Sequence, residues 1–237
     1  MHWDFALILI FFATAVPWLG RRRVRRLMDV PQTTRRDRLT LYVSTIVFQW
    51  LATGLILWRT GAHGIRTTDL GLTIPNPAIV SIVSLLLAAL VLANQIFSLR
   101  HMAAHPSESQ SIVHHLARKV FPQDSAEKWA FSALVLTVAF CEEVVYRGFA
   151  QYIFAEWPVR SVAAGIVGSA ALFSLAHLYQ GRRGLLSTFV VGLIFSLVRW
   201  GTGSLAPPML AHFVADLTAG FLAPSRLGES GDTRNHC

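Results

Sequence analysis

The chain has 237 residues, of which 53% are hydrophobic and only 14% are charged, and its mean hydropathy is +0.48. Soluble domains hold about 45–50% apolar and about 25% charged residues, so these proportions exclude a disordered chain and argue against a soluble globule. Two cysteines, one inside an apolar block and one at the last position, exclude a disulfide scaffold. The net charge of +8 comes from basic residues between apolar blocks, which favours membrane orientation over nucleic-acid binding.

Seven apolar blocks follow one another along the chain. Each has about the 20 residues that a helix needs to cross about 30 Å of hydrocarbon. The blocks cover residues 2–19, 39–58, 78–99, 129–154, 161–179, 184–200 and 205–223. This pattern predicts an all-α, polytopic membrane helical bundle with about seven transmembrane helices.

The basic residues predict the orientation of the bundle. The arginine run at 21–26 follows the first block, whereas a cleavable signal carries its positive charges before the apolar stretch. If the N-terminus lies outside, the connections between the predicted helices lie alternately inside and outside the membrane. Four of the 21 Lys and Arg residues then lie outside, Arg147 lies within a helix, and the other sixteen lie inside. The positive-inside rule therefore predicts a multi-pass protein of the cell membrane with a cytoplasmic C-terminus.

The fourth block contains charged residues at a depth where they are costly. Glu142, Glu143 and Arg147 lie within an apolar helix, and each costs about 2.5–3.5 kcal/mol at a helix centre on insertion scales. Glu143 and Arg147 are four residues apart and share a face, so they are expected to pair. A purely structural clasp would explain that pair but leave Glu142 unpaired. Glu142 is therefore expected to face a wet cavity.

Two later blocks add polar groups. In the fifth block, Ser161, Gly165, Ser169, Phe173 and His177 recur every four residues, and small residues on one face allow close helix packing. That spacing predicts that His177 points into the bundle.

The seventh block carries a second pair of polar side chains. His212 and Asp216 again lie four residues apart in an apolar helix. Ionisable residues within a membrane helix indicate a functional site by default. Taken alone, His177 is better explained as a core residue, and a hydrogen-bonded structural pair is the alternative for His212 and Asp216. Taken together, the three helices favour a site.

These residues form three motifs that resemble those of a known family. The motifs are Glu-Glu-x-x-x-Arg at 142–147, Phe-x-x-x-His at 173–177 and His-x-x-x-Asp at 212–216. They are similar to the CPBP family, which comprises CAAX proteases and bacteriocin-processing (Abi) intramembrane proteins related to the Rce1 endopeptidases. The resemblance covers residues 125–222 and implies a catalytic helical core there. Hydropathy predicts N-terminal transmembrane helices and cytoplasmic loops over 1–124, and composition and the charge split predict a disordered cytoplasmic tail over 223–237.

The resemblance also implies catalytic roles. Glu142 and His177 activate the attacking water, Glu143 and Arg147 form a supporting pair, and the last-helix motif stabilises an oxyanion or binds a metal. That last motif comprises His212 and Asp216 in this chain. Asp216 stands where eukaryotic relatives usually have Asn, and an ionised Asp cannot donate to an oxyanion. It must then be protonated, orient the histidine or bind a metal.

Two questions stay open at this level. Glu142, His177 and His212 could form a tetrahedral zinc set with water, or the protein could hydrolyse without metal. The expected function is an intramembrane endopeptidase acting on a protein or peptide substrate, in contact with membrane lipid and without nucleic acid. The alternative is a non-catalytic membrane module, such as an ion or proton pathway or a partner-protein scaffold.

Overall fold

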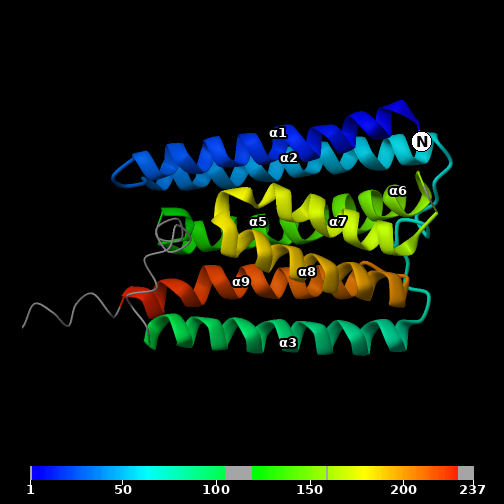
Figure 1. The fold of residues 1–237 in the computed structure, drawn as a ribbon. Helices are drawn as coiled ribbons and strands as arrows, with labels where there is room; N and C mark the ends of the chain where they lie inside the picture. The colour runs from blue at the N-terminus through cyan, green and yellow to red at the C-terminus, as the bar shows by residue number, and fades with distance from the viewer. Residues whose placement is uncertain (1, 105–118, 159, 229–237) are drawn as a thin grey trace, which may run out of the picture.

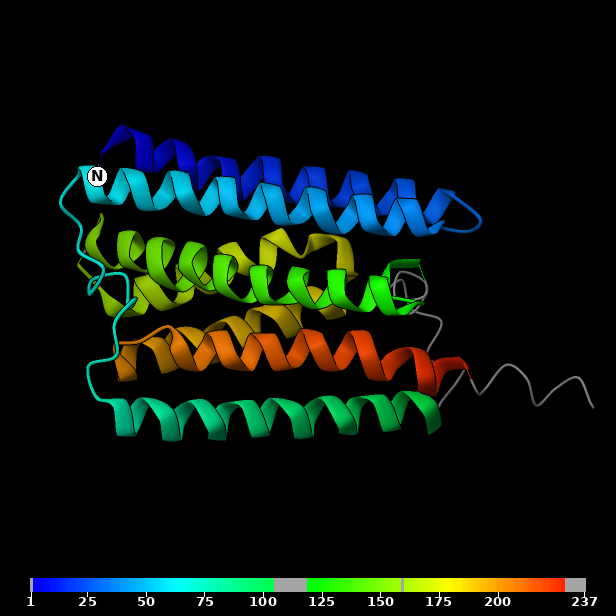
Figure 2. The same ribbon diagram turned by 180° about the vertical axis from the view of Figure 1, so that it is seen from behind.

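The computed structural model describes residues 2–104, 119–158 and 160–228, and every regular element within them is a helix, which confirms the predicted fold class. The long helices run side by side along one direction (Figures 1 and 2). In chain order they are α1 (Trp3–Asp29), α2 (Arg35–Ala62), α3 (Pro77–Ala104), α5 (Ser125–Glu143), η1 (Val144–Ala150), α6 (Gln151–Glu156), α7 (Val162–Ala176), η2 (Leu178–Gln180), α8 (Gly181–Thr202) and α9 (Ala206–Gly228).

The helices form layers that place α5 and α7 in the interior. The α1–α2 pair lies along one edge of the bundle and α3 along the other, with α5 to α9 between them (Figure 1). α3 packs on α9, α2 on α5, and α7 on α6 and α8. The central segments therefore have protein on several sides, and the polar motif residues lie on them.

Five helical segments are long and apolar enough to cross a membrane by length and composition: Trp3–Asp29, Arg35–Ala62, Pro77–His101, Ser125–Glu156 and Leu178–Thr202. α7 is a shorter apolar helix of 15 residues. At 1.5 Å per residue it is about 22 Å long, less than the roughly 30 Å of hydrocarbon. The chain turns at His177 and returns through η2 and α8, so a helix end and its polar backbone groups lie within the bundle (Figure 1).

α1 extends beyond the predicted block. The block ends at residue 19, whereas the helix continues to Asp29 and carries the whole arginine run on its last turns. Arginine is a good helix former, and hydropathy locates the edge of the membrane rather than the end of a helix. The arginines are consequently held on a rigid helix beside α2.

A buried ion pair fixes α2 against α5. Arg38 Nε donates to Glu127 Oε2 at 2.9 Å and its Nη2 donates to Oε1 at 2.8 Å, and both side chains are buried. The start of α5 is capped by Asp124, which accepts a hydrogen bond from the Glu127 backbone N–H, and this bond lowers the pKa of the Asp124 carboxyl. These contacts set the register that brings Gln49 of α2 to the end of α5.

Candidate functional site

A change of helix type occurs at the acidic motif. α5 ends at Glu143, and the next seven residues, Val144–Ala150, form a π-helix in which every residue is buried. Segments with π-type hydrogen bonds are rare and occur frequently at functional sites. The chain passes close to other backbone here, since a Cβ on Gly148 would lie 3.2 Å from the carbonyl oxygen of Leu70. The wider turn thus positions Arg147 in a tightly packed interior.

Three motif residues form one buried network. Arg147 Nη1 donates to Glu143 Oε1 at 2.8 Å, as the sequence predicts, and both side chains are fully buried. The same oxygen lies 2.8 Å from His212 Nδ1 on α9. The network therefore joins α5 to α9 through two residues that are 69 positions apart in the chain. It gives Glu143 two partners where the sequence suggested one.

The second ring nitrogen of His212 faces another carboxylate. Nε2 lies 3.5 Å from Asp216 Oδ2, one turn later on α9. The Asp216 side chain is 41% exposed, whereas that of His212 is 9% exposed. A buried imidazole with a carboxylate on each side is held in one orientation. Asp216 also connects the buried network to a more open region.

Phe173 is the aromatic ring that the site residues share. The guanidinium carbon of Arg147 lies 4.1 Å from the centroid of the Phe173 ring, a cation–π contact. The ring centroids of His177 and His212 lie 4.5 Å and 6.1 Å from the same ring. The first position of the Phe-x-x-x-His motif therefore packs the two histidines and the arginine around one side chain.

The backbone at the end of α7 fixes the orientation of the His177 ring. The His177 N–H bonds to the carbonyl of Ser174, three residues back, and the carbonyl of Phe173 lies 2.9 Å from His177 Nδ1. A carbonyl oxygen only accepts, so Nδ1 carries the proton and donates. In the neutral ring, Nε2 then keeps its lone pair and is the nitrogen available for proton transfer.

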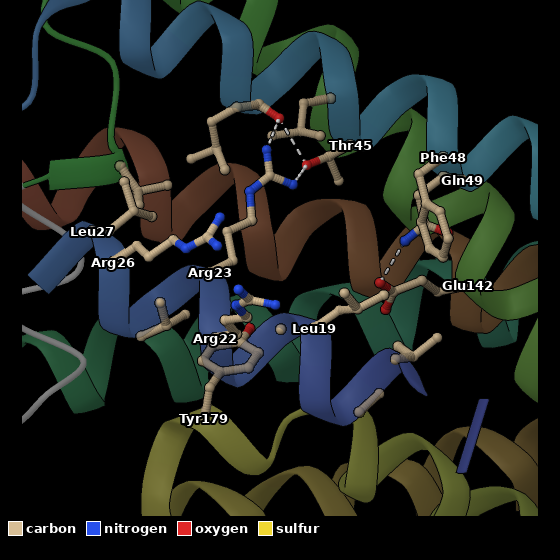
Figure 3. A pocket seen from close by; sticks show the side chains of 17 residues that line it. Leu19, Arg22, Arg23, Arg26, Leu27, Thr45, Phe48, Gln49, Glu142 and Tyr179 are labelled. Atoms are coloured by element: carbon tan, nitrogen blue, oxygen red, sulfur yellow. Dashed lines mark hydrogen bonds between the residues drawn. The ribbon is translucent and has the colours of Figure 1, made fainter. Parts of the chain in front are cut away.

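Glu142 faces a cavity, as the sequence predicts. Its Oε1 accepts a hydrogen bond from Gln49 Nε2 at 2.8 Å, and its Oε2 is buried without a hydrogen-bond partner in the described part of the chain. The cavity has a volume of about 630 Å³ and lies among α1, α2, α5 and the end of α7 (Figure 3). Ala176 and Tyr179, which flank His177 in the chain, also line it.

The structure does not bring every motif residue together. No hydrogen bond joins Glu142 to His177 or His212 among the described residues. The two glutamates point to different partners, Gln49 and the Arg147 network. The site thus has a buried half around Glu143 and a cavity half around Glu142, connected through adjacent residues of α5.

The three metal candidates are not grouped as a metal centre in this arrangement of the described residues. Both ring nitrogens of His212 face carboxylates, Nδ1 of His177 bonds to a carbonyl, and Oε1 of Glu142 is bound to an amide. Within residues 2–104, 119–158 and 160–228, no three His, Cys, Asp or Glu side chains are grouped so that they could hold a metal. His177 Nε2 and Glu142 Oε2 have no hydrogen-bond partner among the described residues, but these two residues and His212 are not grouped as three ligands of one ion.

Sequence reasoning missed Gln49, and it named Phe173 only as part of a motif without predicting its contacts. Gln49, which holds Glu142, lies in an apolar run of α2, and its amide within that run was the signal that could have identified it. The stacking role of Phe173 had no such signal, because a phenylalanine in an apolar helix is ordinary. Both side chains act by holding ionisable groups in place.

Comparison with known proteins gives one family. Residues 124–218 match the family model described as type II CAAX prenyl endopeptidase Rce1-like. The matched region begins at the cap of α5 and ends on α9, so it contains all three motifs and confirms the resemblance that they indicate. No curated protein and no solved structure matches the chain.

Proposed function

We propose that this chain, which carries the Rce1-like family region over residues 124–218, is an intramembrane endopeptidase that hydrolyses a membrane-associated protein or peptide by activated water. The family indicates the class of reaction, and several long apolar helices fit a multi-pass membrane protein. The observation that carries the proposed mechanism is that Glu142 lines the cavity and that its Oε2 has no hydrogen-bond partner among the described residues.

Glu142 is the proposed general base. A buried carboxylate oxygen without a partner is costly, and a water molecule in the cavity would satisfy it. The carboxylate takes a proton from that water while the water oxygen attacks the carbonyl carbon of the scissile peptide. Gln49 holds the other carboxylate oxygen and thereby leaves Oε2 as the one without a protein partner among the described residues. The proton is later delivered to the leaving amine as the C–N bond breaks.

The histidines are proposed to transfer a proton and to stabilise the negative charge of the tetrahedral intermediate. His177, with its proton held on Nδ1, accepts or returns a proton through Nε2. His212, when protonated on both nitrogens, can donate through Nε2 to the tetrahedral oxyanion. Glu143 is a positioning residue here, because it holds the opposite nitrogen of the His212 ring. Asp216 balances the charge of that ring.

We propose that this hydrolysis proceeds without a metal. The support is His212, because both of its ring nitrogens face carboxylates, and the absence of any group of three His, Cys, Asp or Glu side chains suited to a metal within the described residues. Elemental analysis of the purified protein together with a chelator tests this: activity should persist after chelation. Stoichiometric zinc that disappears, along with activity, in His177→Ala and His212→Ala would contradict it.

A non-catalytic module is the competing function, since buried ionisable groups also suit an ion or proton pathway. Mapping of protein termini in membranes separates the two. Membranes containing the wild-type chain should yield new N-termini that are missing when Glu142→Gln is present at equal abundance. A matched variant, Glu156→Gln at the end of α6, should yield the wild-type set. Identical termini for all three chains would reject proteolysis.

A further inference from the structure

The last turns of α1 carry positive charge that no acid in the described chain neutralises. Five arginines lie at 21–26, and none of them has a carboxylate within 4.0 Å among the described residues, whereas Arg38 and Arg59 on α2 both form ion pairs. Arginines placed so close together repel one another unless an anion is present. Such a cluster on a rigid helix is therefore suited to an anionic ligand.

Three of these arginines line the cavity that contains Glu142 (Figure 3). Arg23 donates to neutral oxygens of α2, at 2.6 Å to Ser44 Oγ and at 3.3 Å to Thr45 Oγ1. The guanidinium carbon of Arg22 lies 5.3 Å from the centroid of the Trp18 ring, a cation–π contact, and none of its N–H groups forms a hydrogen bond within the described residues. Arg22 and Arg26 are one turn apart and thus share a face of α1.

The rest of the cavity lining is largely apolar, and an apolar groove lies next to the cavity. The cavity is completed by side chains such as Val16, Leu19 and Phe48, and Glu142 is the acidic residue in its lining. A neighbouring groove of about 350 Å³ between α1 and α2 is lined by apolar side chains alone and shares Phe48 with the cavity. A basic end and an apolar end thus follow one another along the same two helices.

We propose that Arg22 and Arg26 bind the phosphate of an anionic phospholipid whose acyl chain lies along the apolar wall towards Phe48. Guanidinium groups bind phosphate through two parallel N–H bonds, and basic pockets between membrane helices suit lipid headgroups. A peptide would leave backbone N–H and C=O groups unsatisfied in the apolar groove, whereas an acyl chain has none. The lipid would share this cavity with Glu142, but its binding requires no proteolysis and is measured separately.

Matched variants of the purified full chain test the site. Arg22→Gln/Arg26→Gln removes two charges that line the cavity, and Arg21→Gln/Arg25→Gln removes two from the face of α1 that does not. Binding of phosphatidylglycerol, with phosphatidylcholine as the neutral lipid, is measured by native mass spectrometry or fluorescence titration in detergent. At about 1 kcal/mol for each arginine, the first variant should bind phosphatidylglycerol about 30-fold more weakly. The second should bind nearly as the wild type.

Several results would overturn the proposal. Equal loss in both variants would mean general surface attraction, and equal affinity for phosphatidylcholine would mean that the charge is not recognised. If inorganic phosphate displaces phosphatidylglycerol at the same concentration as the lipid, the site binds a free anion rather than a lipid. Displacement by an acidic peptide at that concentration would assign it to a polypeptide. Circular dichroism of both variants should match the wild type, and the lipid result holds whether or not the chain cleaves peptides.

Discussion

Glu143 Oε1 lies 2.8 Å from His212 Nδ1, and the same oxygen accepts the guanidinium of Arg147 at 2.8 Å. One carboxylate oxygen thus anchors a histidine of α9 and an arginine of the π-helix. A carboxylate so occupied is a poor acceptor for the proton of a water molecule. The second oxygen of each glutamate lacks a hydrogen-bond partner among the described residues, but only Glu142 of the two lines the cavity, so Glu142 is the better candidate for the base.

Arg147→Ala is expected to destabilise the fold. The substitution removes the guanidinium that neutralises a fully buried Glu143, and breaking a buried ion pair from one side costs about 3–5 kcal/mol. The purified variant should unfold at lower temperature or denaturant concentration than the wild type in the same detergent, and its folded yield should fall.

Removal of both charges is the control for that effect. Glu143→Gln/Arg147→Met leaves no unpaired charge, so it should be more stable than Arg147→Ala although it changes more atoms. If the double variant is at least as unstable as the single one, packing around Phe173 rather than charge explains the loss.

Asp216 should tolerate Asn but not Ala. Asn keeps an oxygen that can accept from His212 Nε2, whereas Ala leaves that nitrogen without its neighbour. The contact is 3.5 Å long, so we expect a loss near the low end for charge-assisted bonds, about tenfold in kcat. The measurement is the cleavage rate of both variants at saturating substrate. Equal rates for Ala and wild type would remove Asp216 from the site.

Gly165→Ala tests the close packing of α6 and α7. A Cβ at this position would lie 2.7 Å from the carbonyl oxygen of Gln151 and 2.8 Å from the Cβ of Ala155. Overpacking of this kind costs about 1–3 kcal/mol. Gly54→Ala on α2 is the control, because nothing lies within 4 Å of its added methyl group. Thermal unfolding should distinguish the two, and equal unfolding temperatures would contradict the close approach.

The sequence predicted much of the fold and the identity of the motif residues. Long apolar blocks identify helices directly, and the i, i+4 spacing of Glu143 and Arg147 predicts their pairing. The π-helix after Glu143 could not be predicted from the sequence, because this segment packs against residues that are distant in the chain, such as Leu70. The contact between Gln49 and Glu142 spans 93 residues and requires the register of two helices.

Orientation in the membrane remains a prediction that fusions can test. The α1–α2 connection and the ends of α3 and α9 lie at one end of the bundle, opposite the α2–α3 and α8–α9 connections (Figure 1). That arrangement agrees with the split of basic residues. Reporter fusions at Arg118 and Arg234, both outside the described residues, should indicate a cytoplasmic location. Activity of a periplasmic reporter at both positions would contradict the assignment.

The central claim is that Glu142 activates water for peptide hydrolysis. The most direct test uses a peptide spanning a cleavage site found by terminus mapping, with purified wild-type, Glu142→Gln and Glu156→Gln chains at matched folding. The account predicts that Glu142→Gln lowers kcat by about 10²–10⁴-fold, with Glu156→Gln unchanged. Full proteolysis by folded Glu142→Gln would contradict the account.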